Sequence, residues 1–193
     1  GHTKGAFTGA TSTTTGKMEI ANKGTVFLDD VDTLDTSMQA KLLRVLQESE
    51  IQPLGSKAPI QVDVRVVAAT NKDLQQEMQG GRFREDLYYR LNVVHIVLPP
   101  LKERQEDIPL LVDHFIKKYA SERQSAAPVT GVDQEVDRLF FDYNWPGNIR
   151  ELENIIERSC IIERSSLLLP DSFPAEFFLH DETLTGIRMD TML

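Results

Sequence analysis

An aspartate pair follows a short apolar run near the start of the chain. The run Gly24–Leu28 is β-prone and ends abruptly at Asp29 and Asp30. Such a run is typical of a parallel strand buried on both faces, with polar groups at its carboxyl end. Ligands of α/β proteins bind at that end, and Mg²⁺ prefers one or two carboxylates with phosphate oxygens and water. The pair indicates such a site; the alternative is a turn with solvated carboxylates.

A second candidate site is the loop Gly5-Ala6-Phe7-Thr8-Gly9-Ala10. Its two glycines give the backbone freedom, and a phenylalanine at the tip of a loop is difficult to bury locally. An exposed aromatic side chain on a mobile loop usually marks a contact with a partner. The alternative is that Phe7 folds back onto its own domain.

The elements that would position these residues belong to an α/β sheet. Strands are predicted at Gly24–Leu28, Val64–Ala69 and Val93–Leu98, the last stopped by Pro99-Pro100. Asp35 is expected to cap a helix that follows the first strand, and Ile51–Asp63 is expected to form a hairpin. Strands separated by helices imply a parallel sheet.

Beyond Leu101 the pattern becomes helical. Three helices are predicted, the first after Asp107, the second over residues 133–143 and the third from Asn148, whose pairing with Glu151 resembles a capping box. The third helix carries an apolar stripe of Ile149, Leu152, Ile155, Ile156 and Cys160.

The first ten residues, Gly1–Ala10, resemble the signature loop of bacterial enhancer-binding proteins, the AAA+ activators of sigma-54 RNA polymerase. Six further stretches resemble the same family in the same order, so that the resemblance covers about residues 1–165. They are similar to its Walker B strand (Gly24–Asp30), the next helix (Gln39–Glu48), sensor I (Ala68–Asn71), the arginine-finger segment (Phe83–Leu91), the junction to the lid (Leu98–Leu101) and sensor II (Trp145–Leu152).

The resemblance implies roles for both aspartates in binding ATP and Mg²⁺. Asp29 would hold Mg²⁺, directly or through water. Asp30 stands where the family usually has the glutamate that polarises the attacking water. Aspartate is shorter by one C–C bond, about 1.5 Å. This departure is expected to slow hydrolysis unless the backbone compensates.

Four further side chains receive roles from the resemblance. Asn71 would sense the γ-phosphate, and Arg84 and Arg90 would reach into a neighbouring subunit's site to neutralise charge during phosphoryl transfer. Arg150 would face the nucleotide. The alternatives are a turn asparagine, arginines paired with Glu85 or Asp86, and a solvated charge at position 150.

The resemblance implies an incomplete AAA+ P-loop NTPase-type parallel sheet over residues 1–100, a helical lid over 101–165 and an irregular tail or linker over 166–193. The chain contains no Gly-x-x-x-x-Gly-Lys-Ser/Thr motif. In this family that Walker A loop precedes the signature loop, so the chain is expected to follow it within a longer protein. Without the motif's amides and lysine, the isolated chain is expected to hydrolyse ATP negligibly.

The implied function is transcription regulation. A ring of subunits, a hexamer, would hydrolyse ATP, and residues 5–10 would engage the sigma-54 RNA polymerase holoenzyme to remodel closed complexes. One alternative is an AAA+ remodeller of another client. The other is a non-hydrolysing binding module, for which Asp30 and the absent Walker A motif argue.

Composition narrows the remaining choices. Residues 1–100 have a charge balance of −1 and residues 101–193 one of −8, so neither offers the basic face that nucleic-acid backbones select. Direct DNA contact by this segment is not expected. A single cysteine, Cys160, forbids an internal disulfide and suits a reducing cytoplasm, and no apolar run is long enough to span a membrane.

Overall fold

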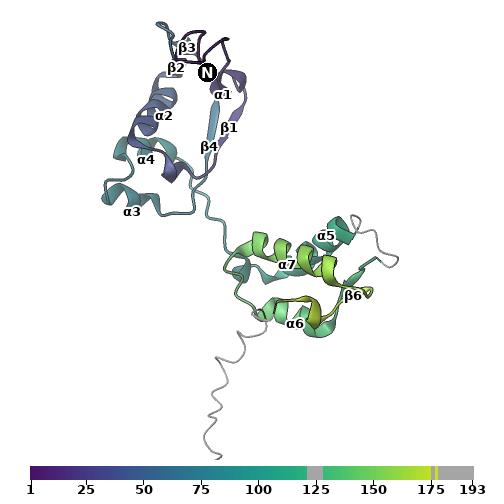
Figure 1. The fold of residues 1–193 in the computed structure, drawn as a ribbon. Helices are drawn as coiled ribbons and strands as arrows, with labels where there is room; N and C mark the ends of the chain where they lie inside the picture. The colour runs from purple at the N-terminus through teal and green to yellow at the C-terminus, as the bar shows by residue number, and fades with distance from the viewer. Residues whose placement is uncertain (121–127, 175–176, 178–193) are drawn as a thin grey trace, which may run out of the picture. The chain divides into compact units, whose positions relative to one another are not determined.

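The computed structural model describes residues 1–120, 128–174 and 177. The chain divides into two units, Gly1–Ile96 and Val97–Leu193 (Figure 1). Within the described ranges, no helix combines the length and the apolar character that crossing a membrane requires.

Two parallel strands form the sheet of the first unit. Strand β1 (Thr25–Leu28) pairs with β4 (Arg65–Ala68), in the register Leu28 opposite Ala68, and the two lie side by side in Figure 1. This confirms two of the three predicted strands. Their carboxyl ends therefore lie at the same edge. The expected burial of both faces is wrong for this pair, because Phe27 is 62% exposed and Val67 38% exposed.

The helices of the first unit pack around a small core. Helix α2 (Thr36–Glu48) is capped as predicted, since the Asp35 carboxylate accepts a hydrogen bond from the Met38 N–H at 2.8 Å. Three shorter helices are α1 (Lys17–Ile20), α3 (Leu74–Gln79) and α4 (Glu85–Leu91), and a 3-10 turn, η1, spans Val31–Thr33. The buried core consists of Val31, Leu42, Leu43, Phe83 and Leu87.

The predicted hairpin is present. Strands β2 (Glu50–Ile51) and β3 (Ile60–Gln61) are antiparallel. Helix α3, by contrast, was not predicted from the sequence. Asp73 caps α3 by accepting hydrogen bonds from the N–H groups of Gln75 and Gln76. An aspartate before Leu74 was the available signal for it.

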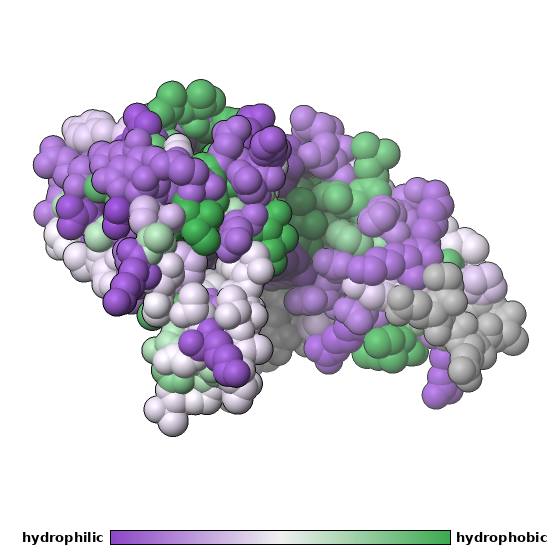
Figure 2. All heavy atoms as spheres, turned by 90° about the horizontal axis from the view of Figure 1, so that it is seen from above, coloured by the Kyte–Doolittle hydropathy of each residue, from purple (hydrophilic) through white to green (hydrophobic). Residues whose placement is uncertain are grey.

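The predicted third strand, Val93–Leu98, is wrong. The run has no strand assignment, and five of its apolar side chains are 73–81% exposed. A strand needs a neighbour for its backbone groups, and within the described ranges β4 pairs with β1 alone. The apolar pattern therefore indicates a segment suited to burial, but it does not show which strand the segment would pair with. Figure 2 shows hydrophobic atoms at the surface among hydrophilic ones.

The second unit is mainly helical, as predicted. Helices α5 (Ile108–Ala120), α6 (Gln134–Asp142) and α7 (Asn148–Ile162) follow the 3-10 turns η2 (Leu101–Glu103) and η3 (Gln105–Asp107). Strand β5 (Gly131–Val132) pairs in parallel with β6 (Leu167–Leu168), and a last 3-10 turn, η4, spans Pro170–Ser172. Residues 121–127, between α5 and β5, lie outside the described residues.

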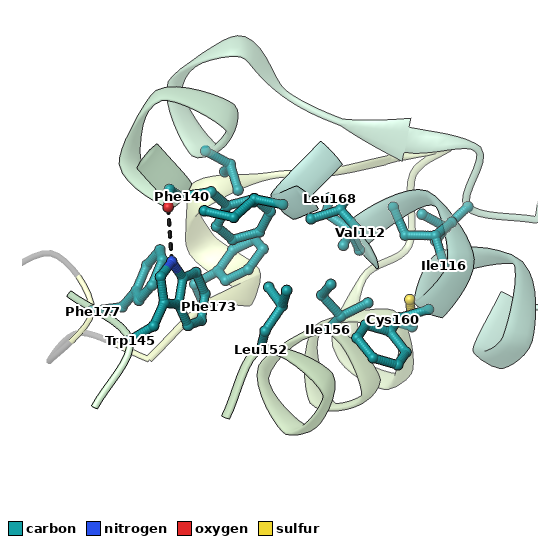
Figure 3. Close-up of a cluster of buried hydrophobic side chains, with 14 of the residues drawn as sticks. Val112, Ile116, Phe140, Trp145, Leu152, Ile156, Cys160, Leu168, Phe173 and Phe177 are labelled. Atoms are coloured by element: carbon teal, nitrogen blue, oxygen red, sulfur yellow. Dashed lines mark hydrogen bonds between the residues drawn. The ribbon is translucent and has the colours of Figure 1, made fainter. Parts of the chain in front are cut away.

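Aromatic and aliphatic side chains fill the core of this unit (Figure 3). Leu152, Ile156 and Cys160 of the predicted α7 stripe are buried, and Trp145 is 1% exposed. The Trp145 Nε1–H donates to the Phe140 carbonyl oxygen at 2.8 Å, the dashed line in Figure 3. A buried indole needs such a partner for its N–H.

The start of α7 differs from the predicted capping box. Glu151 does accept a hydrogen bond from a backbone N–H, that of Gly147 at 2.8 Å. Asn148, however, has φ of 53° and accepts from the distant Leu101 N–H at 2.8 Å instead of capping its own helix. The sequence pattern is local, whereas the partner of Asn148 comes from 47 residues away.

Part of the predicted irregular tail belongs to this core. Leu168 and Phe173 are buried in it together with Phe177. Strand β6 and turn η4 carry the first two of these side chains into place. The remainder of the tail, residues 175–176 and 178–193, lies outside the described residues.

Candidate functional site

The turn after β1 presents both predicted carboxylates. Asp29 and Asp30 are exposed, and Asp30 adopts a left-handed conformation with φ of 50° and ψ of 47°. Its carbonyl oxygen accepts hydrogen bonds from the Thr33 N–H at 2.9 Å and the Thr33 hydroxyl at 2.7 Å. The Asp30 N–H donates to Asp29 Oδ1 at 3.1 Å. Aspartate tolerates the left-handed region better than most residues, so this sharp turn suits the sequence.

The turn after β4 lies directly beside it. The Ala69 N–H donates to the Leu28 carbonyl at 2.8 Å, and the Val31 N–H donates to the Ala69 carbonyl at 3.0 Å. These bonds continue the parallel register past the ends of both strands. Asn71, exposed two residues beyond Ala69, therefore belongs to the same edge as the aspartate pair.

A third carboxylate, Asp32, links the two turns. It accepts a hydrogen bond from the Thr70 hydroxyl at 2.6 Å and forms an ion pair with the Lys72 ammonium at 3.0 Å. Its side chain is 1% exposed. The Thr70 hydrogen bond holds the pKa of Asp32 below its usual value, and Asp32 in turn raises the pKa of Lys72. Asp32 was not among the predicted site residues; its signal in the sequence is a further carboxylate within four residues of the end of β1.

The donor set of this edge fits Mg²⁺ bound together with phosphates. Among the described residues, no three His, Cys, Asp or Glu side chains gather into a group that could hold a metal ion by themselves. The exposed oxygens of Asp29 and Asp30 could occupy one or two coordination positions of the ion. Phosphate and water would fill the others, which is the arrangement that Mg²⁺ favours.

The two predicted finger arginines are held within the first unit. Arg84 forms a two-pronged ion pair with Asp86, with contacts of 3.0 and 2.7 Å, which raises the pKa of Arg84. Arg90 donates from Nη2 and Nε to the Leu46 carbonyl of α2, at 2.9 and 3.3 Å. Within the described ranges, neither contacts Asp29 or Asn71. The pairing with Asp86 is one of the alternatives considered above.

A buried glutamine fixes the segment before Arg84. Gln39 of α2 is 1% exposed, and its Nε2 donates to the carbonyls of Leu34 and Arg82 at 2.8 and 3.0 Å. Its Oε1 accepts from the Arg84 N–H at 2.8 Å. All three bonds are made in a buried setting, so the segment that leads into α4 is tied firmly to α2.

Arg150 lies in the second unit, on α7. It is exposed, whereas Leu152 and Ile156 of the same helix are buried. An exposed side chain fits both the role facing a nucleotide and the alternative of a solvated charge. Its place near a nucleotide stays a prediction.

The candidate partner loop is compact at its base and exposed at its tip. The Gly5 N–H donates to the Ala10 carbonyl at 2.8 Å, and Gly5 and Gly9 have φ of 80° and 100°. Phe7 is 53% exposed, and its ring makes an edge-type contact with the His2 ring, with centroids 5.0 Å apart. The tip phenylalanine is therefore not folded into the core of its unit.

The hairpin turn between β2 and β3 supports this loop. The Thr3 N–H donates to the Leu54 carbonyl at 2.9 Å, and the Leu54 N–H donates to the Gly1 carbonyl at 3.1 Å. Gly55 has φ of 80°, and a Cβ there would lie 2.5 Å from Thr3 Oγ1 and 2.8 Å from Ala6 Cβ. Only glycine allows this close approach without displacement.

Carboxylates and an asparagine that follow two parallel strands, an exposed aromatic loop in the same unit and a helical unit after it are together typical of an AAA+ domain. Two family profiles match: the sigma-54 interaction domain over residues 1–97 and the AAA+ ATPase lid domain over residues 102–186. The chain belongs to the sigma-54 interaction family of AAA+ proteins.

Similar proteins support that assignment. Regulatory protein AtoC of Escherichia coli is 47% identical over 91% of this chain and 38% of its own length. Transcriptional regulatory protein ZraR of Salmonella typhimurium is 51% identical over 84% of this chain and 36% of its own length. The chain thus spans less than two fifths of the length of these relatives.

Solved structures show the same fold. NtrX from Brucella abortus in complex with ATP superposes with a TM-score of 0.78, at 33% identity, over 91% of this chain and 40% of that chain. The complex of the same protein with ADP gives a TM-score of 0.76 at 35% identity, over 83% of this chain and 37% of that chain. The fold is that of an AAA+ domain, incomplete in its α/β part, with a helical lid.

Proposed function

We propose that this chain is the part of a sigma-54-dependent activator that couples ATP hydrolysis to remodelling of closed RNA polymerase complexes in the cytoplasm. The observation that carries the proposal is the joined pair of turns, which brings Asp29 and Asp30 to the same edge as Asn71, in one unit with the exposed Phe7 loop. One unit would then both hydrolyse ATP and contact the polymerase.

Each residue at the edge has a distinct task in this proposal. Asp29 holds Mg²⁺, directly or through water, and Asn71 contacts the γ-phosphate. Bound Mg²⁺ neutralises phosphate charge. Asp30 orients the attacking water, although its side chain is shorter than the usual glutamate, and the left-handed turn at Asp30 sets where its carboxylate begins.

The arginines act between subunits of a ring, in this proposal a hexamer. Arg84 and Arg90 leave their present partners, Asp86 and the Leu46 carbonyl, to reach the phosphates bound by a neighbouring subunit. Arg150 contacts nucleotide from the lid. A positive charge delivered to the transferring phosphoryl group accounts for large factors in rate in other nucleotide hydrolases.

Phe7, together with Gly5, Ala6, Thr8, Gly9 and Ala10, forms the surface for sigma-54. An exposed aromatic anchor with a backbone held at its base presents contact area at low entropic cost. The acidic balance of the segment leaves DNA contact to other parts of the protein.

The test uses the protein that contains this chain, held with a nucleotide analogue that mimics the hydrolysis transition state. Phe7→Ala is expected to weaken sigma-54 binding roughly a hundredfold, as for the loss of an aromatic anchor that becomes buried in an interface, with ATP hydrolysis within about twofold of the parent. Leu110→Ala is the matched control, because Leu110 is 73% exposed in the other unit. Unchanged sigma-54 binding by Phe7→Ala would remove the assignment of this client and favour another AAA+ remodelling task.

A second pair of variants tests the support of the loop. Gly55→Ala introduces a Cβ against Thr3 and Ala6, whereas Gly81→Ala introduces one at a similar φ of 71° into open space. Sigma-54 binding should fall with the first and not with the second. If the parent protein binds sigma-54 but never hydrolyses ATP, the non-hydrolysing binding module is the better description.

A further inference from the structure

The side chain of Asp32 occupies an unusual place between the two turns of the site. Its two partners, Thr70 and Lys72, stand on either side of Asn71 in the sequence. Asp32 itself follows the Asp29-Asp30 pair on η1. Asp32 therefore belongs to the turn that carries the aspartate pair. Its carboxylate binds the residues on both sides of Asn71 in the other turn.

Because the Asp32 side chain is shielded from water, it depends on these two contacts. A carboxylate that is 1% exposed has lost its water and depends on the donors that replace it. Thr70 supplies a hydroxyl at 2.6 Å, and its oxygen also accepts the Lys72 N–H at 3.1 Å. The positions of Asp32, Thr70 and Lys72 are therefore coupled in one small network.

Backbone hydrogen bonds alone do not reach Asn71. The last backbone bond between the turns, among the described residues, joins the Val31 N–H to the Ala69 carbonyl. Beyond Ala69 the Asp32 contacts are the link between the two turns that the described residues show. Asn71 lies past the end of β4, between the two residues that Asp32 contacts.

We propose that Asp32 is a positioning residue for ATP hydrolysis, which holds Asn71 at a fixed place relative to Asp29 and Asp30. This inference rests on the proposed function. Displacement of a catalytic group by about 1 Å can lower a rate a hundredfold, so a buried link of this kind affects turnover without touching ATP.

Two other roles for Asp32 fit the contacts less well. As a metal ligand it would have to expose its oxygens, which already face Thr70 and Lys72 in a buried setting. As a plain surface ion pair it would leave the Thr70 bond unexplained, and Lys72 is itself 52% exposed, where ion pairs contribute little.

The experiment measures kcat and nucleotide Kd for the protein that contains this chain. Asp32→Ala removes both contacts, and Thr70→Val removes only the hydroxyl at nearly constant volume. Each is expected to lower kcat about tenfold or more, with nucleotide Kd changed less than about twofold. Glu50→Ala is the matched control, because Glu50 is a carboxylate of strand β2, with a side chain 23% exposed, that pairs with Arg44 and Gln61 in the same unit.

A double-mutant cycle with Asn71→Ala separates positioning from general stability. If Asp32 acts through Asn71, Asp32→Ala should lower kcat by less than about twofold on the Asn71→Ala background. Losses that multiply instead, or a kcat unaffected by Asp32→Ala, would overturn the inference. Thr70→Val gives the same decision if Asp32→Ala does not fold.

The outcomes distinguish this inference from the proposed function beneath it. If Asn71→Ala leaves hydrolysis unchanged, or the parent hydrolyses no ATP, the proposed ATPase site is wrong and Asp32 has nothing to position. If Asn71→Ala lowers kcat while Asp32→Ala acts like the control Glu50→Ala, the site stands and only the role of Asp32 is wrong.

Discussion

The two units of the chain differ in the size of their hydrophobic cores. In the second unit fifteen described residues form one buried cluster, in which Phe140, Trp145 and Phe173 pack edge to face or tilted around one another. The first unit has a buried cluster of five residues and leaves the sheet residue Phe27 62% exposed. The helical unit therefore has a large buried core, whereas the sheet unit has a small core and presents polar residues at the carboxyl ends of its strands.

The chemistry lies in the unit with the smaller core. Asp29, Asp30 and Asn71 are exposed at the end of a two-stranded sheet, and their turns are held by backbone hydrogen bonds and Asp32. Sites that bind and release ligands need exposed, adjustable groups on a positioned frame. The comparison predicts that function and stability can be changed separately in this chain.

The largest expected effect concerns the chain on its own. The 193-residue chain, which contains no Walker A motif, should hydrolyse ATP on the order of a thousandfold more slowly than a protein in which that motif accompanies it. A phosphate-release assay over a range of ATP concentrations measures this. The second unit should nevertheless show a cooperative unfolding transition in the same sample.

Turnover by the isolated chain close to that of the parent would contradict this expectation. It would mean that the edge formed by β1 and β4 binds the phosphates without a Walker A loop. The first unit would then hydrolyse ATP with its small core and exposed strand ends alone.

Paired core substitutions test whether the two units unfold independently. Leu152→Ala should destabilise the second unit by about 2–5 kcal/mol, because the side chain is fully buried against the aromatic cluster. Trp145 is the only tryptophan of the chain, so its fluorescence reports unfolding of this unit. Denaturant titration gives the free energy of unfolding.

The matched change in the first unit is Leu87→Ala, also at a fully buried leucine. It should leave the tryptophan transition in place while it shifts a far-ultraviolet circular dichroism transition of the first unit. A common shift of both signals with either variant would show that the units unfold as one, against the comparison drawn above.

How far the sequence predicts this molecule depends on whether a feature is local. Asp35 caps α2 and the run Gly24–Leu28 yields β1, because capping and strand propensity act over a few residues. The neighbourhood of Asp29-Asp30 and Asn71 also follows from strand order in a parallel sheet. These parts of the fold and site are determined by short stretches of sequence.

Most of the misses involve partners distant in the sequence; helix α3 is the exception, because its signal, the Asp73 cap, is local. Val93–Leu98 has strand composition, but pairing is decided by a neighbour that its own residues do not encode. Asn148 binds Leu101, and Asp32 binds Thr70 38 residues away. Such contacts become visible only when both segments are placed, so the link that Asp32 makes between the two turns could not be predicted from motifs, although the carboxylate itself stands close to the strand end in the sequence.

The smallest expected effect concerns pH and the end of α7. Burial would by itself raise the pKa of Glu163, but hydrogen bonds from the N–H groups of Ser165, Leu169 and Arg164 outweigh it and lower the pKa to about 2. A folded-state pKa below the ordinary value of 4.5 means that the ionised form stabilises the fold.

The contribution is complete above about pH 4.5 and is lost as the pH falls toward 2, since the protonated carboxyl accepts these bonds less well. Urea unfolding followed by Trp145 fluorescence at pH 7 and pH 3 should show a smaller drop for Glu163→Gln than for the parent. Glu103→Gln, on the 3-10 turn η2, is the control for a carboxylate on an exposed surface. An equal drop in all three proteins would place the acid sensitivity elsewhere, and the second unit would then depend on its aromatic packing alone.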